Sequence, residues 1–457
     1  MSEQTLSTKK VVTRFAPSPT GKFHVGGLRS ALYNYLYARK HGGTYILRCE
    51  DTDPIRSKKE YEDYFLELFK WLGIEHDAYY RQSERTEIYR SYLNKMIAEG
   101  HAYVSKEQPK EEGGRTEVIR FKNPNGVVTF HDDVLGNISF NTAELGDFII
   151  ARDFDSPLYH LTVVIDDFEM GVTHIIRGQE HVSNTPRQIL IQEAIGAPRP
   201  TYAHASIILN NERAKLSKRD PLVRPALEYR DEGYVPEALL NFMALLGWNP
   251  GTEQEIFSMP ELIQAFSIER MQKQGAVFNP EKLEWINKEY IKKMHPKRQM
   301  AMLDEFMPEA IRTLPDYKEK REHLAPILLE RIGHFGEIKE MVAQGELAYY
   351  FIQPEYEKEK LFWKDERDSA KLIERLVRVS DTLSALPSEV FTREGIKEAL
   401  WPYAESEGRG QILWPMRYAL SGRDKSPDPF QLASLLGKKE TLERLAFAIA
   451  LYHDQHE

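Results

Sequence analysis

The sequence predicts an α/β part built on a mostly parallel sheet with a β-rich insertion, followed by an all-α part. Two observations lead to this fold class. Up to about Arg224, short β-prone runs alternate with helical stretches, which is the pattern of βαβ units. Beyond that point β-prone runs become scarce, and Leu, Glu, Lys and Arg dominate. A chain of 457 residues has room for about three domains.

The first elements follow from local composition. Residues 11–15 are a short β-prone run, and the Pro/Gly-rich loop 17–21 follows it. Residues 26–40 are helical and are closed by two glycines, and residues 44–49 form the next strand candidate. A further helix is marked by apolar residues at a spacing near 3.6, namely Tyr61, Tyr64, Phe65, Leu68 and Leu72.

The β-rich insertion begins near His101. Residues 118–121 and 127–130 flank the segment Asn-Pro-Asn-Gly at 123–126. Because Asn-Gly supplies the positive φ of a tight turn, the sequence predicts a hairpin there. The α/β pattern then resumes with strand candidates at 163–165, 173–176 and 205–209 and a helix at 185–195. Helices are predicted at 237–246, 260–266 and 279–294, and helical spacing continues towards the C-terminus in Leu442, Leu445, Ile449 and Tyr452.

Composition excludes several classes of protein. The net charge of −9 argues against a uniformly basic nucleic-acid coat protein, although it leaves room for a local basic groove. The single cysteine, Cys49, excludes a disulfide within the chain and any multi-cysteine zinc site. No signal segment precedes residue 10 and no apolar run reaches about 18 residues, so we expect a cytoplasmic protein without a membrane span.

The densest motif is Arg-Phe-Ala-Pro-Ser-Pro-Thr-Gly-Lys-Phe-His-Val-Gly-Gly at 14–27. A strand, a Pro/Gly loop and a helix start would place backbone N–H groups and the His24 imidazole beside a polyphosphate. The small Gly26 and Gly27 let a nucleotide approach the backbone closely. Taken alone, a His-x-Gly-Gly segment is more often an ordinary loop with a surface histidine.

A second motif, Lys-Leu-Ser-Lys-Arg, occupies 215–219 after a strand candidate. Lysines on such a loop suit a transition state in which negative charge builds on phosphate oxygens. Alone, the run is typical of a solvated basic loop. Its position downstream of His-x-Gly-Gly on one α/β domain makes the pair specific.

Together the two motifs resemble those of class I aminoacyl-tRNA synthetases, and residues 14–27 resemble the glutamyl-tRNA synthetase family of bacterial type. The likeness covers nearly the whole chain and extends through segments 48–53, 164–167, 176–178, 184–188, 229–234, 244–248, 415–417 and 435–440. It implies a Rossmann-type catalytic domain in two halves (1–100 and 158–224) around an insertion at 101–157 that clamps the acceptor end. It also implies a helical stem-contact domain at 225–305 and an all-α anticodon-binding domain at 306–457.

The resemblance implies that ATP and L-glutamate form glutamyl-adenylate, with release of pyrophosphate, and that the glutamyl group then passes to the 3′ end of tRNA(Glu), with release of AMP. Mg²⁺ is expected with the ATP. The implied catalytic residues are His24, Lys215 and Lys218. The implied ATP-binding residues are Pro17, Ser18, Thr20, Gly21, His24, Gly26, Gly27, Glu180 and Lys218, and the implied glutamate-binding residues are Arg14, Ala16, Ser18, Glu50, Tyr159 and Arg177.

Charge complementarity explains the glutamate set. Arg14 and Arg177 each offer a bidentate fork for a carboxylate, with Arg14 on the side chain and Arg177 on the α-carboxylate, or the reverse. Glu50 would accept from the ammonium, and Ser18 and Tyr159 would complete the hydrogen bonds. Glutamine would leave one fork partly unpaired, so no editing domain is needed. Without the resemblance, these arginines would be read as ordinary ion-pair residues at strand ends.

Contact with tRNA requires local basic faces, and the clearest runs are 291–298 and 318–321. Many bacterial relatives carry a zinc site in the insertion, but here that region has no cysteine, so no zinc is expected; a metal on His101 and His131 is the weaker alternative. The family expectation is a monomer, and charging of tRNA(Gln) as well as tRNA(Glu) stays open.

Three other functions compete with this interpretation. One is a truncated paralogue that activates glutamate to modify a tRNA base, but such proteins lack the anticodon-binding part. Another is a small-molecule nucleotidyltransferase, which has no need of a long helical back half. The third is a tRNA-binding protein that has lost catalysis, which the intact His24, Lys215 and Lys218 argue against.

Overall fold

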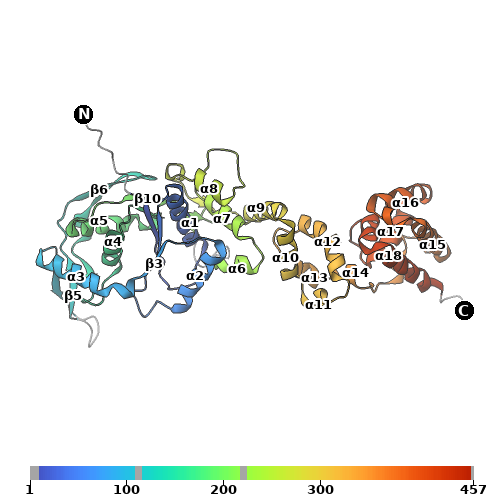
Figure 1. Cartoon of the computed structure of the whole chain (residues 1–457), viewed down its shortest axis with the longest axis horizontal. Coiled ribbons are helices and arrows are strands. Elements are labelled where there is room, and N and C mark those ends of the chain that lie inside the picture. Colours follow the sequence, from blue (N-terminus) through green and yellow to red (C-terminus); the bar gives the residue numbers. More distant parts are fainter. Residues whose placement is uncertain (1–9, 109–115, 217–223, 454–457) are drawn as a thin grey trace. The chain divides into compact units, whose positions relative to one another are not determined.

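The computed structural model describes residues 10–108, 116–216 and 224–453. The chain divides into two compact units, Met1–Tyr290 and Ile291–Glu457, and each is described by itself (Figure 1).

The first unit opens with three parallel strands, β1 (Val12–Phe15), β2 (Thr44–Cys49) and β3 (Ala78–Arg81), in the order β1-β2-β3. The helices α1 (Val25–Lys40) and α2 (Lys59–Leu72) connect them. The alternation therefore builds parallel βαβ units, as the sequence predicts. The strands β1 and β2 and the helix α1 all begin and end within a residue of the predicted ranges.

A second sheet has the order β7-β6-β10-β9, and its strands are β6 (Val127–Asp132), β7 (Gly136–Asn141), β9 (His174–Gly178) and β10 (Thr201–Ala205). The helix α5 (Thr185–Ile195) connects β9 to β10. The two sheets meet where Thr173 N donates to Val12 O at 2.9 Å, which brings β9 beside β1. The chain leaves β1 towards β2 on one side and returns through β9 and β10 on the other. In an open α/β sheet, such a switch point leaves a crevice at the carboxyl ends of the strands.

The insertion differs from its prediction. Its antiparallel sheet consists of β4 (Ala102–Lys106), β5 (Glu117–Phe121) and β8 (Phe148–Ala151). The predicted hairpin between 118–121 and 127–130 is wrong, because β5 pairs with β4 and β8 whereas β6 pairs with β7 and β10. Asn125 does adopt a positive φ of 51°. Turn chemistry fixes the bend, but the partner of each strand is decided by burial on the sheet.

The predicted strand at 163–165 is also wrong, because these residues lie in α4 (Tyr159–Glu169). Val163, Val164 and Ile165 are all buried, in a core shared with residues of α3 (Thr86–Ala98) and α5. A helix buried on several sides reads as a continuous apolar run, which period alone cannot distinguish from a buried strand. The predicted strand at 205–209 is split: β10 ends at Ala205, and β11 (Ile208–Leu209) pairs with β12 (Ala276–Val277).

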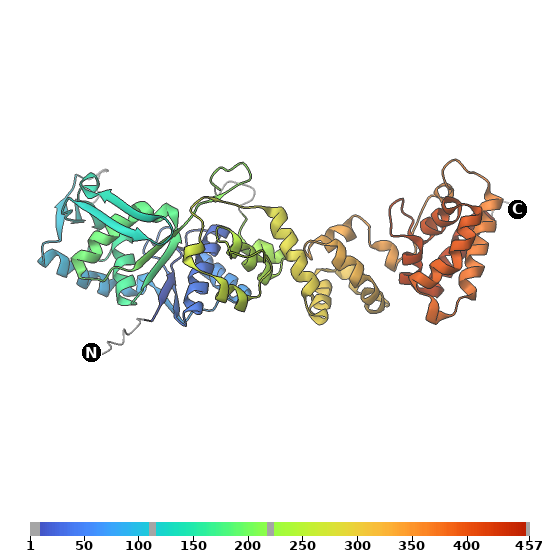
Figure 2. The same cartoon turned by 90° about the horizontal axis from the view of Figure 1, so that it is seen from above.

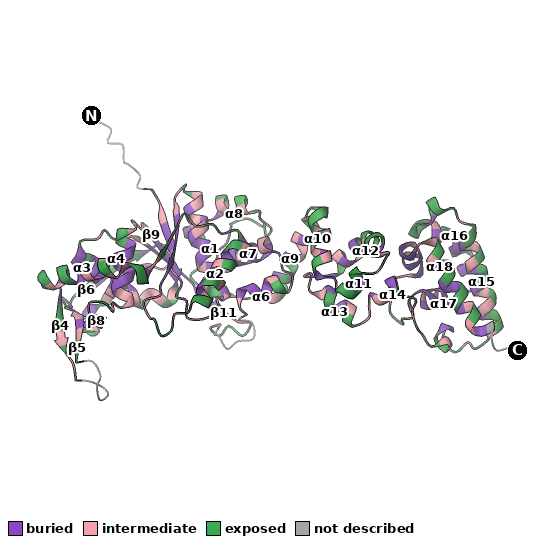
Figure 3. Ribbon diagram, turned by 60° about the horizontal axis from the view of Figure 1, so that its bottom comes forward, coloured by how far each residue is buried: buried purple, intermediate pink, exposed green. Residues whose placement is uncertain are grey.

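Helices complete the first unit: α6 (Ala226–Asp231), α7 (Pro236–Leu245), α8 (Met259–Ala265) and α9 (Pro280–Lys293). The last three confirm the predicted ranges to within one residue. Both α7 and α8 pack on α1, beside the sheet (Figure 1). The buried Arg29 of α1 donates to Leu246 O, and so does the hydroxyl of Tyr33. The strands β2, β9 and β10 and the helix α1 are largely buried (Figure 3).

The described residues of the second unit form helices joined by loops (Figure 2). Four of them pack together: α15 (Ser369–Ala385), α16 (Arg393–Glu407), α17 (Arg409–Ser421) and α18 (Pro429–His453). Arg444 of α18 is buried, and its guanidinium donates to Tyr349 O at 2.6 Å. The prediction of an all-α C-terminal part is confirmed. No described helix is long and apolar enough to cross a membrane. The helices before these four are α10 (Pro296–Phe306), α11 (Glu309–Arg312), α12 (Tyr317–Arg331), α13 (Glu337–Ala343) and α14 (Ala348–Phe351).

Candidate active site

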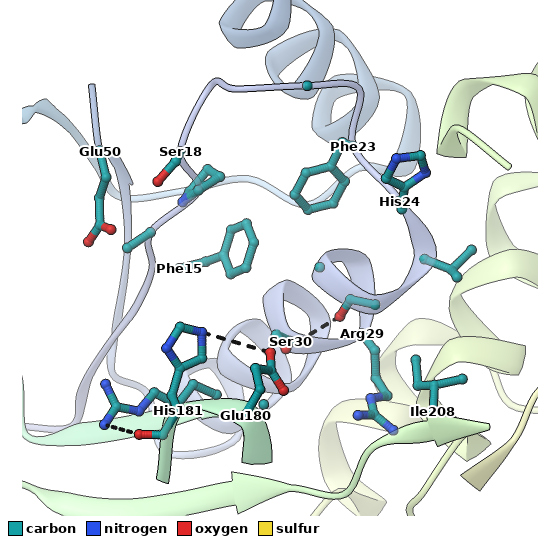
Figure 4. A pocket seen from close by; sticks show the side chains of 18 of the residues that line it. Phe15, Ser18, Phe23, His24, Arg29, Ser30, Glu50, Glu180, His181 and Ile208 are labelled. Carbon is teal, nitrogen blue, oxygen red and sulfur yellow. Dashed lines mark hydrogen bonds and ion pairs between the residues drawn. The ribbon is translucent and has the colours of Figure 1, made fainter. Parts of the chain in front are cut away.

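A cleft of about 580 Å³ opens at the carboxyl ends of β1 and β9. Figure 4 shows Glu50 at one side of it and His24 at the other, with Phe15 and Phe23 between them. Every predicted site residue that the structure describes lines this cleft; Lys218 lies outside the described residues. The predicted residues that line it are Arg14, Ala16, Pro17, Ser18, Thr20, Gly21, His24, Gly26, Gly27, Glu50, Tyr159, Arg177, Glu180 and Lys215.

The His24 side of the cleft is the start of α1. His24 is the N-cap residue, with an extended backbone, and the first turn of this helix of 16 residues contains no acidic side chain. The backbone N–H groups of the first turn of α1, which have no acceptor within the helix, and the helix dipole therefore favour an anion at this end. A Cβ at Gly26 would meet nothing nearer than Ile208 Cδ1 at 4.0 Å, whereas one at Gly27 would lie 2.7 Å from the Phe23 ring. Gly26 thus leaves open space, and Gly27 is required for packing.

The loop between β1 and α1 is held at several points. Phe23 packs edge-on against Phe15, with ring centroids 5.6 Å apart, and against Phe69 at 5.7 Å. Backbone hydrogen bonds of 2.9 Å run from Glu50 N to Pro17 O and from Lys58 N to Pro19 O. The Pro/Gly segment is therefore fixed on the rest of the domain.

The Glu50 side is a buried cluster of charges. Asp167 accepts from Arg14 Nε at 3.2 Å and from Arg48 Nη1 at 2.8 Å, and Arg48 also pairs with Glu50 at 3.2 Å. Burial works against ionisation of Asp167, but the two arginines outweigh it and hold the pKa of that carboxyl below its ordinary value. For Glu50, burial dominates and raises the pKa despite Arg48. Arg48 and Asp167 received no role from the sequence, although both lie in segments that carry the resemblance.

Arg177, at the end of β9, is also buried, and burial lowers its pKa. Its Nε donates to His204 Nε2 at 3.1 Å, and its Nη2 donates to Thr185 Oγ1 at 2.7 Å. The remaining nitrogen, Nη1, is buried and has no hydrogen-bond partner among the described residues. A buried guanidinium with an unused donor at the wall of a cleft favours an anionic ligand.

Tyr159 and His181 lie near this arginine. Tyr159 is the first residue of α4, and its hydroxyl lies 3.4 Å from His181 Nδ1. Burial, with a contribution from Arg177, lowers the pKa of His181 to about 4, so this ring is neutral near pH 7. Glu180 stands over Gly178, where a Cβ would lie 2.2 Å from its carboxylate oxygen. A side chain at 178 would therefore require the Glu180 carboxylate to move aside.

Lys215 lines the cleft from a short antiparallel turn of the chain, residues 208–216. Its backbone bridges to Leu209, and Leu216 N donates to Ile208 O at 2.9 Å. Where the described chain resumes, Pro225 bridges to His24, and Ala226 N donates to Phe23 O at 2.9 Å. Both flanks of segment 217–223 therefore lie at the His24 side of the cleft.

Comparison with known proteins follows this geometry. The family model described as "tRNA synthetases class I (E and Q), catalytic domain" matches residues 10–112 and 105–285, and the model "Anticodon binding domain" matches 281–449. A glutamate–tRNA ligase of Aquifex aeolicus is 40% identical over 476 aligned residues, which cover 95% of this chain and 98% of that protein. This chain belongs to the glutamate–tRNA ligase family. A Geobacter sulfurreducens member is 38% identical, with 96% and 98% covered.

Solved structures of the glutamate–tRNA ligase family agree. The enzyme of Elizabethkingia meningosepticum, crystallised in complex with its amino acid, has a TM-score of 0.85 at 32% identity, with 97% of this chain and 99% of that chain covered. The enzyme of Elizabethkingia anophelis has a TM-score of 0.83 at 32% identity, with 97% and 100% covered. The predicted family, fold class and enzyme class are confirmed.

For metals, the described residues contain no group of three or more histidine, cysteine, aspartate or glutamate side chains that could hold an ion. His131, one half of the weaker alternative, is exposed and bonds to Asn137 at 2.7 Å. The expected lack of zinc stays a prediction, because residues 109–115 of the insertion lie outside the described part of the chain.

Proposed function

We propose that this cleft joins L-glutamate to ATP as glutamyl-adenylate and then transfers the glutamyl group to the 3′ end of tRNA(Glu). The observation that carries the proposal is the Nη1 of buried Arg177, which has no partner in the part of the chain that the structure describes and shares one cleft with Arg14, Glu50 and the start of α1. One side of the cleft thus offers donors and an acceptor for an amino acid, and the other offers helix N–H groups for phosphates.

Glutamate would lie at the Glu50 side. Arg177 would bind one carboxylate of glutamate through Nη1. Arg14 would bind the other carboxylate through its two terminal nitrogens, because its Nε already donates to Asp167. Glu50 would accept from the ammonium, while Ser18, Tyr159 and the backbone at Ala16 would complete the contacts. Which arginine takes which carboxylate stays open.

ATP, as its Mg²⁺ complex, would lie at the His24 side. Pro17, Thr20 and Gly21 would border the nucleotide from the loop, Gly26 and Gly27 from α1, and Glu180 from the turn after β9. His24, Lys215 and Lys218 would stabilise the charge that builds on the phosphate oxygens as pyrophosphate leaves. Because the glutamate α-carboxylate is already ionised at pH 7, its attack on the α-phosphorus requires no general base, only positioning and charge stabilisation.

The tRNA would reach the cleft from the insertion. A second cleft of about 640 Å³ shares Ser18, Glu50 and Tyr159 with the first and extends to Arg152 and Ser156. This supports entry of the tRNA 3′ end past the insertion (101–157), with stem contact by 225–305 and anticodon contact by 306–457. Of the two basic runs, 291–298 is the better surface, because in 318–321 Lys320 is bound by Asp316 and Glu440 and Arg321 by Asp304.

Pyrophosphate exchange tests the proposal. With glutamate, ATP, Mg²⁺ and tRNA(Glu), labelled pyrophosphate is expected to enter ATP, and aspartate and glutamine are expected to support little exchange. Exchange followed by charging of the 3′ end excludes a base-modifying paralogue and a small-molecule nucleotidyltransferase. No exchange under any condition would leave a non-catalytic tRNA-binding protein. Omitting tRNA shows whether activation requires it.

Three finer properties go with this proposal. Charging of purified tRNA(Gln) next to tRNA(Glu) decides whether the enzyme discriminates between them. A monomer of 53.1 kDa is expected in light scattering, and a cytoplasmic location is proposed from membership of the glutamate–tRNA ligase family.

A further inference from the structure

A buried row of three side chains crosses the second sheet behind the cleft. Asp132 ends β6, His204 lies in β10 and Arg177 lies in β9. Arg177 and His204 are register partners, and β6 pairs with β10 at Asp132 and Tyr202. Asp132 and His204 are both 0% exposed. Neither residue lines the cleft, and neither is used by the reaction described above.

The hydrogen bonds fix the protonation of the histidine. A guanidinium only donates, so His204 Nε2, which lies 3.1 Å from Arg177 Nε, must be the acceptor. The ring proton therefore resides on Nδ1, which donates to Asp132 Oδ2 at 2.5 Å. Burial lowers the pKa of His204 despite its bond to Asp132, which agrees with a neutral ring.

Asp132 is itself held firmly. Its other oxygen, Oδ1, accepts from the backbone of Val134 at 3.0 Å, of Leu135 at 2.8 Å and of His204 at 3.3 Å. Burial opposes ionisation of this carboxyl, but the His204 bond and these backbone N–H groups outweigh it and lower its pKa. The turn between β6 and β7 thus anchors one end of the row.

We propose that Asp132 and His204 are positioning residues for glutamate recognition, which orient Arg177 so that its Nη1 stays available to a substrate carboxylate. His204 takes up Nε and Thr185 takes up Nη2, so the plane of the guanidinium is fixed from two sides. The proposal rests on the proposed role of Arg177 as a carboxylate ligand. It adds that the neutral tautomer with the proton on Nδ1 is required, because a proton on Nε2 would face the N–H of Arg177.

The variant Asp132→Asn tests this directly. The amide oxygen is expected to keep the N–H groups of Val134 and Leu135, which turns the amide NH₂ towards His204 Nδ1. Nδ1 must then accept, the ring proton moves to Nε2, and Nε2 repels Arg177. In pyrophosphate exchange, KM for glutamate is expected to rise roughly tenfold or more, as when a residue that orients a ligand-binding group is lost, with KM for ATP within about twofold. The matched control is Asp133→Asn, the same change at the next, exposed residue, which leaves both constants unchanged.

Two further variants separate positioning from packing. His204→Gln keeps an oxygen that can accept from Arg177, whereas His204→Leu does not, so Gln is expected to retain glutamate affinity better than Leu. An unchanged glutamate KM in Asp132→Asn, equal rises for glutamate and ATP, or equal losses in the Gln and Leu variants would each overturn the proposal.

The tautomer can also be read in the wild-type chain, with the His204→Gln variant used only to assign the signal. In ¹⁵N-histidine spectra of the wild-type chain at pH 7.5, the signal missing from His204→Gln is expected to show protonated Nδ1 and unprotonated Nε2; a proton on Nε2 contradicts the proposal. The variant Arg177→Gln separates a failure of the proposed role of Arg177 from a failure of the positioning inference. If it leaves glutamate KM unchanged, the role of Arg177 fails. If it raises that KM while Asp132→Asn does not, only the positioning inference fails.

Discussion

The Nε of Arg14 lies 3.2 Å from Oδ1 of Asp167, which follows it by 153 positions in the chain. This bond joins the end of β1 to the last turn of α4. It engages the Nε of Arg14, a residue that lines the cleft. Asp167 thereby sets the orientation of a proposed glutamate ligand and also neutralises part of the positive charge buried beneath the cleft.

Asp167→Asn is expected to destabilise the protein strongly. Arg48 has 0% of its side chain exposed and would lose its bond to Asp167, leaving an incompletely compensated buried charge. Breaking a buried pair in this way costs about 3–5 kcal/mol. Urea unfolding measures the change. Asp63→Asn, which loses only an exposed pair with Lys59, is the matched control and is expected to change little. A loss of less than 1 kcal/mol, on the order of an exposed pair, would show that the cluster is not stabilising.

Arg14→Gln is expected to raise KM for glutamate far more than KM for ATP, because it removes a charged fork from the amino-acid side of the cleft only. Loss of a charge-assisted bidentate contact corresponds to roughly tenfold or more. Steady-state exchange with each substrate varied in turn makes the comparison. Equal increases for both substrates would contradict the assignment of Arg14 to glutamate.

Lys218→Ala is expected to slow adenylate formation more than it weakens glutamate binding, because the lysine acts on charge that develops in the transition state. Lys215→Ala should show the same pattern. Pre-steady-state kinetics separates the two constants, with Lys215→Arg and Lys218→Arg as variants that keep the charge. A collapse of glutamate affinity with an unchanged chemical step would assign these lysines a different role.

The pH dependence of glutamate KM is expected to report Glu50. Burial raises the pKa of this carboxyl above the ordinary value of 4.5. Only the ionised form accepts from the substrate ammonium, so KM rises as pH falls through that raised pKa. His181, with a pKa of about 4, contributes no inflection near neutrality. Rate measurements between about pH 5 and 8 with Glu50→Gln as the control test this; an inflection that persists in the variant belongs to another group.

Salt dependence tests the tRNA surface. Lys293 and Lys297 are exposed in the run 291–298. Changing each to Glu is expected to weaken tRNA binding and to lower the slope of log Kd against log salt by about 1 for each lost phosphate contact. Lys293→Arg and Lys297→Arg keep the charge and should keep the slope. Filter binding from 50 to 300 mM salt, on the order of the range over which such contacts are screened, supplies the data. An unchanged slope in the Glu variants would move the tRNA contact elsewhere.

The fold was predictable where local signals agree with burial. Helix α1, strand β2 and helix α5 were located closely because glycines or a clear period bound them. The hairpin at 118–130 failed because a correct turn does not say which sheet each arm joins. The strand at 163–165 failed because a helix buried on several sides loses its period.

The cleft was predictable at the residues that the family motif carries, from Arg14 to Gly27, together with Glu50, Tyr159, Arg177 and Lys215. The side chains behind them were not. Asp167, Asp132 and His204 act through contacts between distant strands and helices, and an isolated aspartate or histidine in a sequence gives no sign of such a partner. The charge run 318–321 shows a related limit: a run of basic residues does not reveal which of them are paired, and Lys320 is 9% exposed and bound to two acids.

The meeting of β1 with β9 has a consequence for synthesis of the chain. The first motif ends at Gly27, but Val12 bonds to Thr173, and Asn34 of α1 donates to Ile176 O at 2.7 Å. During synthesis from the N-terminus, the loop between β1 and α1 is therefore made long before β9 and β10, which end at Ala205, are available to pack beside β1. A nascent chain stopped before that residue carries half a cleft, so ligand binding cannot assist its folding until almost half of the polypeptide has been made.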